Sequence, residues 1–147
     1  MVLRSFAVLF LVTSNAFASD WTIVPDRSQL TFEGTQAGTS FQGSFADFST
    51  AITLDPTDLE NSSISVEIVT ASATSGSAER DGALPGADWF DVATHPTASF
   101  VSSFVTKTDA GYAAEGALTI KGTTHPVTLP FSLDIDGDEA TAAGSLT

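Results

Sequence analysis

The sequence predicts an all-β domain, and two features of it support this fold class. Several segments alternate apolar and polar residues with a period of two, which is typical of half-buried antiparallel strands. Turn-forming residues separate these segments at intervals of roughly ten residues, a spacing that favours a β-sandwich or a β-barrel.

Four segments carry the alternation most clearly, and the last of them places five apolar side chains on one face. Pro130 lies on the polar face of that segment, and proline cannot donate to a ladder, so we expect a bulge or an edge there. The segments are SQLTFE (28–33), SISVEIV (63–69), YAAEGALTI (112–120) and VTLPFSLDI (127–135).

One segment, residues 75–91, is too long and irregular for a hairpin turn. Its sequence is SGSAERDGALPGADWFD. We expect a short helical turn around Ala78–Asp81, followed by a loop over the end of the sheet.

The first eighteen residues have the pattern of a cleavable leader. Arg4 precedes an apolar run over residues 6–12, and an A-x-A motif ends at Ala18. The run is too short to cross a bilayer. We therefore expect residues 1–18 to be a signal peptide cleaved after Ala18, and residues 19–147 to form one domain.

The composition narrows the classes of partner. The chain has 18 Asp and Glu against 5 Lys and Arg, a formal net charge of −13 at pH 7, and no cysteine. Such a surface repels phosphate backbones, so we expect no nucleic-acid partner. No apolar run after residue 18 approaches a membrane-spanning length, so we expect no stable membrane insertion. The core must form without disulfides.

Catalytic patterns are weak. His95 and His125 each precede a proline, which pushes a residue to extended geometry, so each is interpreted as a strand entry. Asp88 and Asp91 are carboxylates of the kind used in glycoside hydrolysis, but they lie three residues apart in a loop. A hydrolase or isomerase that uses Asp88, Asp91 and His95 stays open as the enzyme alternative.

Metal binding is not expected. Asp134, Asp136 and Asp138 have the first spacings of a calcium loop, but Glu139 stands where that loop needs glycine. An Asp-Gly hairpin turn is the preferred interpretation. The two histidines lack zinc spacing.

The strands are rich in phenylalanine. Phe41, Gly43 and Phe45 share one strand face, and Phe100 and Phe104 are assigned to another. Rings that flank small residues can pack as a solid core, or they can leave a tube in a closed sheet of about eight strands. Both interpretations stay open, and a lined apolar cavity is the leading functional hypothesis.

Taken together, four motifs make the chain similar to the YceI-like family of bacterial periplasmic lipid-binding proteins. They follow the family's order over most of residues 19–147. The motifs are WTIVPDRSQLTFEGTQAG (21–38), FQGSFADFSTAITLDP (41–56), ERDGALPGADWFDVATHPTASF (79–100) and GALTIKGTTHPVTLPFSL (116–133).

The resemblance implies a lipocalin-like antiparallel β-barrel whose elongated apolar interior holds a polyisoprenoid or another long-chain amphiphile. It brings no catalytic residues and no cofactor. Family members usually continue beyond the position of Thr147, so either the C-terminal strands that close the barrel are missing here or the barrel is completed differently. An edge left open in this way would favour association, for example as a homodimer.

Strand parity then predicts the ligand-binding residues. Arg80 is the one cation beside the 75–91 loop, and it is assigned either to a lipid head-group or to a salt bridge with Asp81. The predicted lining residues are Phe32, Phe41, Phe45, Phe100, Phe104 and Leu118, with Trp89 and Phe90 near the mouth.

We therefore expect a non-catalytic periplasmic protein that carries or sequesters a long-chain apolar lipid, polyisoprenoid-like or fatty-acid-derived. A third hypothesis, besides the carrier and the enzyme, is a solid-core barrel that acts as an interaction partner of a membrane redox protein.

Overall fold

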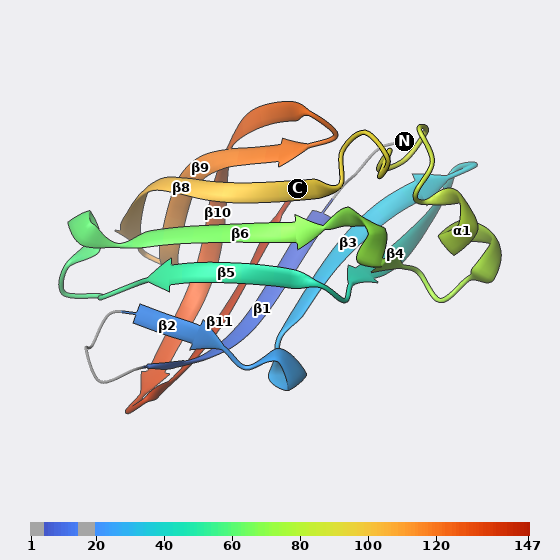
Figure 1. Ribbon diagram of the computed structural model, residues 1–147. Coiled ribbons are helices and arrows are strands. Elements are labelled where there is room, and N and C mark those ends of the chain that lie inside the picture. The colour runs from blue at the N-terminus through green and yellow to red at the C-terminus, as the bar shows by residue number, and fades with distance from the viewer. Residues whose placement is uncertain (1–4, 15–19) are drawn as a thin grey trace.

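The computed structural model describes residues 5–14 and 20–147 (Figure 1). Within these ranges the chain forms eleven strands, three short 3-10 turns and one short helix. The strands are β1 (Ser5–Ser14), β2 (Asp20–Ile23), β3 (Gln29–Gln36), β4 (Thr39–Phe45), β5 (Phe48–Thr53), β6 (Ser63–Val69), β7 (Ala73–Thr74), β8 (Thr97–Thr108), β9 (Gly111–Ile120), β10 (Thr123–Asp136) and β11 (Glu139–Leu146). The helix is α1 (Ala78–Ala83), and the turns are η1 (Pro25–Arg27), η2 (Leu59–Asn61) and η3 (Thr70–Ser72).

All of these strands belong to one antiparallel sheet that curls on itself. Its order is β11-β10-β9-β8-β6-β5-β2-β1-β3-β4-β7, and β11 also pairs with β1. In Figure 1, β8, β6, β5 and β2 cross the front, while β10, β11 and β1 run steeply behind them. The prediction of an all-β antiparallel barrel is confirmed. No helix in the described ranges has the length and hydropathy needed to cross a membrane.

Strand β1 joins the β11 end of the curled sheet to β2 and β3. One edge pairs with β11, from Phe6 opposite Leu146 to Thr13 opposite Glu139. The other edge pairs with β3 along its first half and with β2 at its end. β1 therefore closes the ring of strands that runs from β11 to β2, and β3, β4 and β7 continue the sheet from it. The edge of β11, which was predicted to be open in residues 19–147, pairs with β1 in the chain that still carries residues 5–14.

β1 lies within the residues predicted to be a signal peptide. Its Leu11 is fixed by neighbours: the N–H donates to Ser28 Oγ at 3.2 Å, and the carbonyl accepts from the Val24 N–H at 2.7 Å. Arg4 and the cleavage motif at Ala18 lie outside the described residues, so cleavage stays a prediction.

Several local predictions can be compared directly with the structure. β6 spans the predicted 63–69 segment, and α1 begins at the predicted Ala78. The acidic 134–140 stretch forms a hairpin in which Asp136 pairs with Glu139 and Gly137 adopts a φ of 60°.

The two histidine-proline pairs behave differently. His95 comes just before β8, as predicted, but His125 lies inside β10, which begins two residues earlier at Thr123. Pro130 lies where β10 leaves the β11 ladder, since that pairing starts at Phe131. Pro130 therefore lies at an edge only on the side of β10 that faces β11, because on the other side it pairs with Ala113 of β9.

The core is an aromatic cluster built around Phe32. Its ring centroid lies 4.9 Å from that of Phe45 and 5.3 Å from that of Phe90, and all three side chains are almost fully buried. Gly43 pairs with Phe32 across β3 and β4. A Cβ at Gly43 would lie 2.3 Å from Phe32 Cζ, so only glycine leaves room for the ring.

The predicted inward position of Phe104 is wrong. The pairing of β8 with β9 shifts register between Ser102 and Phe104, as in a β-bulge. The extra residue reverses the alternation of faces. Phe100 stays buried, whereas Phe104 is 47% exposed and Val105 takes the inward place.

Substitution of Gly43 tests the close approach of the Phe32 ring. In Gly43→Ala the new methyl group forces the ring or the strand to move, so we expect a loss of about 1–3 kcal/mol in the free energy of unfolding. Gly82→Ala is the control, because nothing lies within 4 Å of its Cβ position. We expect that control to be neutral or stabilising by up to about 1 kcal/mol in urea denaturation. Equal losses for the two variants would contradict this account of the core.

A second pair of variants tests the bulge. Phe100→Ala removes a buried ring and should destabilise by about 3–5 kcal/mol. Phe104→Ala removes an exposed ring and should change the free energy of unfolding by no more than about 0.5 kcal/mol. A larger loss for Phe104→Ala than for Phe100→Ala in denaturant titrations would show that the alternation is not reversed.

Candidate functional site

The interior of the barrel is apolar and mostly filled. Near α1 it holds the rings of Phe32, Phe45 and Phe90, and toward the opposite end of β6 it leaves a small cavity of about 40 Å³. On the same measure a single water molecule needs about 10–15 Å³, so the cavity has room for only a few atoms of that size. The cavity is lined by Phe10, Trp21, Ile52, Leu54, Ile64, Leu129, Phe131, Leu133, Ala142, Ala143 and Gly144.

No ionisable side chain lines this cavity in the described part of the chain. The one polar group among its lining side chains, the indole N–H of Trp21, donates to the Leu54 carbonyl at 2.8 Å. Phe10 of β1 contributes a buried ring, 6% exposed. The site thus offers contact with methylene and methyl groups and no anchor for a charged group.

The residues predicted to line a pocket lie at the other end, and none of them borders this cavity. Phe32, Phe45, Phe90, Phe100 and Trp89 are buried in the core, and Phe41 and Leu118 are half-buried against it. Phe104 lies on the outer surface, for the reason given above. Contact of these residues with a ligand stays a prediction.

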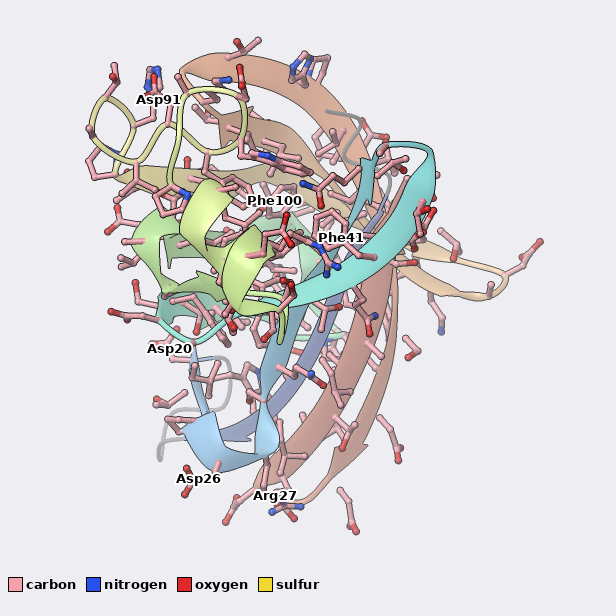
Figure 2. All side chains as sticks on the ribbon, turned by 90° about the vertical axis from the view of Figure 1, so that its right-hand side faces the viewer. Asp20, Asp26, Arg27, Phe41, Asp91 and Phe100 are labelled. Carbon is pink, nitrogen blue, oxygen red and sulfur yellow. The ribbon has the colours of Figure 1, made fainter. Side chains whose placement is uncertain are left out.

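The end of the barrel near α1 is covered by the segment that follows β7. Figure 2 looks at this end and shows Phe41 of β4 beside α1, with Asp91 in the loop above. Phe90 inserts from that loop between Phe32 and Phe45. Lys121 Nζ donates to the carbonyl of Ala87, which ties the loop to the turn between β9 and β10.

Asp81 anchors the start of this covering segment. Its carboxylate accepts from the Ser75 N–H at 2.6 Å, from Ser75 Oγ at 2.7 Å and from Thr74 Oγ1 at 2.8 Å. These hydrogen bonds, from the Ser75 hydroxyl first, hold the pKa of Asp81 below its ordinary value of 3.8. Sequence reasoning missed this role, because it placed Asp81 only as a partner for Arg80.

Arg80 makes no ion pair with Asp81, which corrects one of the two predicted assignments. In the described residues the ion pair is Arg27 with Glu139, at 2.5 Å. The guanidinium of Arg80 lies over the ring of Phe41, 4.5 Å from its centroid. It is a half-buried cation at the edge of the aromatic cluster.

The residues of the enzyme alternative do not form a joined set. Asp88 is exposed, and the Asp91 carboxylate accepts from Thr94 Oγ1 at 3.2 Å. The His95 ring lies against Gly122, where an added Cβ would lie 2.6 Å from it. Within the described ranges no hydrogen bond joins the three side chains.

This geometry defines a class of protein: a small antiparallel barrel with an apolar interior, one end of which is covered by the segment after β7. A match to the YceI-like domain covers residues 21–147, and the chain belongs to that family.

Two curated relatives are UPF0312 proteins. One, from Pseudomonas putida (strain W619), is 35% identical over 148 residues, which cover 95% of this chain and 77% of the relative. The other, from Yersinia pestis (strain Pestoides F), is 34% identical over 138 residues, with 92% and 72% covered.

Solved structures agree with the fold. Burkholderia cenocepacia BcnA is 23% identical with a TM-score of 0.65, and 96% of each chain is covered. The Campylobacter jejuni YCEI protein is 27% identical with a TM-score of 0.61, covering 69% of this chain and 60% of that one. The first of these likenesses shows the fold alone.

The Asp81 anchor predicts a pH dependence. A carboxylate with a lowered folded pKa stabilises fully above its unfolded value and loses that contribution as the pH falls through the folded pKa. Asp81→Asn should therefore raise amide hydrogen exchange at Ser75 at pH 7, and the difference from the parent should shrink below about pH 4. Asp88→Asn, at an exposed site, is the control and should match the parent throughout. A difference for Asp81→Asn that stays constant down to pH 2 would refute the anchor.

Proposed function

We propose that the chain is a non-catalytic binding protein for a long-chain apolar lipid, polyisoprenoid-like or fatty-acid-derived, held inside the barrel. The observation that carries this proposal is the apolar interior, whose cavity has no ionisable lining group in the described residues. Membership of the YceI-like family supports it. The leader pattern adds the proposal that the protein is exported to the periplasm and cleaved after Ala18.

Binding would depend on the transfer of chain methylenes out of water. Each buried CH₂ contributes about 0.8 kcal/mol, so roughly ten of them offset a large part of the association cost of about 4–15 kcal/mol. A headless hydrocarbon gains all of its affinity in this way, which fits an interior without polar anchors.

A long chain needs more than the 40 Å³ of the cavity. Of the rings that fill the interior, Phe90 comes from the loop after α1 and not from a strand. Withdrawal of that loop would join the cavity to the barrel mouth. We propose this movement as the entry step for lipid.

The small cavity also favours a second candidate. A barrel whose interior stays filled by Phe32, Phe45 and Phe90 would act as an interaction partner of another protein, such as a membrane redox protein. Lipid content distinguishes the two functions.

The carrier function is tested on protein purified from its own host. Native mass spectrometry should show the polypeptide with a bound adduct, and organic extraction should release a long-chain lipid. The same spectrum should give a chain that begins at Ser19 if cleavage follows Ala18. A bare polypeptide mass with no extractable lipid would favour the solid-core interaction partner.

A variant with a smaller cavity tests whether the lipid occupies this cavity. Ala142→Val adds two methyl groups at the cavity wall, so the lipid recovered per mole of protein should fall. Ala51→Val adds the same volume at an exposed position of β5 and should leave the recovery unchanged. Equal recoveries from the two variants would show that the lipid does not use this cavity.

A further inference from the structure

In the described residues Arg80 forms no salt bridge, although the chain is strongly acidic. The chain carries only five Lys and Arg against 18 Asp and Glu. The neighbouring Asp81 is occupied by Ser75 and Thr74.

The contacts that hold the guanidinium leave it able to bind an anion. Arg80 Nε lies 3.4 Å from Gln36 Oε1, and Arg80 Nη1 lies 3.5 Å from Ser75 Oγ. Both distances are longer than an ordinary N–H···O bond, and both acceptors are neutral. A guanidinium has five N–H donors in a planar fork that matches a carboxylate or phosphate.

Phe41 connects this cation to the apolar interior. Its ring lies under the guanidinium, 4.5 Å from Arg80 Cζ, and contacts Trp89 at 5.4 Å and Phe32 at 6.3 Å between centroids. Gly34 leaves the space that the Phe41 ring occupies, since a Cβ there would lie 2.8 Å from Phe41 Cζ. A charged group at Arg80 therefore lies at the outer end of an aromatic path into the core.

We propose that Arg80, with Gln36 and Ser75 beside it, binds the anionic head-group of an amphiphile whose chain enters the barrel along Phe41 and Trp89. The head-group is a phosphate or a carboxylate. This inference rests on the proposed lipid-binding function. The net charge of −13 repels anions elsewhere on the surface, so the Arg80 guanidinium beside Phe41 also fixes the orientation of the ligand, head outward and chain inward.

The test compares charged and neutral probes of equal chain length on the purified full chain. The probes are dodecyl phosphate, dodecanoate and dodecanol, with inorganic phosphate as the anion without a chain. At about 50 mM ionic strength, where screening is weak, the anionic amphiphiles should bind about tenfold more tightly than dodecanol, because charge-assisted hydrogen bonds to Arg80 add to chain burial.

Variants assign the effect to one side chain. Arg80→Gln should weaken binding of the anionic amphiphiles about tenfold and leave dodecanol within about twofold. Arg80→Lys keeps the charge but not the fork, and should retain part of the preference. Lys107→Gln is the matched control, since it removes one positive charge from an exposed position near the far end of β8. Circular dichroism checks that each variant is folded.

Each other result overturns the inference. If Lys107→Gln weakens anionic binding as much as Arg80→Gln, the effect is one of net charge. If dodecanol binds as tightly as the anionic probes, the head-group site is absent while the carrier function stands. If inorganic phosphate competes fully and no amphiphile binds, the site takes a free anion. If nothing binds, the carrier function fails as well.

Discussion

The close approach of the Phe32 ring to Gly43 is the contact on which the rest of the structure depends. It lets β3 and β4 lie flat against the core, so that Phe45 and Phe90 can pack around one ring. Phe90 in turn fixes the loop that covers the barrel end, since its ring enters between the two strands' aromatic side chains. The absence of a Cβ at Gly43 therefore sets the packing around Phe32, and the absence of one at Gly34 leaves the space for the Phe41 ring beside Arg80.

The positions of the strands could be predicted from the alternation of apolar and polar residues. Which side chains face inward could not be predicted along every strand. The segment at 63–69 and the turn at Gly137 appear where the alternation and the Asp-Gly pair place them. Phe104 was assigned to the inner face because the alternation was counted through Ser102 without interruption. The β-bulge adds one residue to β8, and the sequence around it gives no signal of that. After the bulge the residues of β8 face the opposite side from the one predicted.

The candidate site was also predictable only in part. Sequence parity found the rings of Phe32, Phe45 and Phe100 as interior residues, because burial follows the period of a strand. It could not locate the cavity, which is set by the sizes of side chains on strands far apart in sequence, such as Trp21 and Leu129. Nor could it settle the partner of Arg80, since the capture of Asp81 by Ser75 and Thr74 depends on the fold of the loop.

Strand β1 links the two ends of the chain, with Phe6 opposite Leu146. Pairing partners this distant in sequence meet late, because loop-closure entropy must be overcome before their contact contributes. Until β11 has been made, β1 can pair along one edge only, with β2 and β3, and the pairing with β11 then covers its other edge. If cleavage after Ala18 occurs as proposed, β11 loses its β1 partner and β2 and β3 lose theirs, so removal of the leader and closure of the sheet through β1 exclude each other.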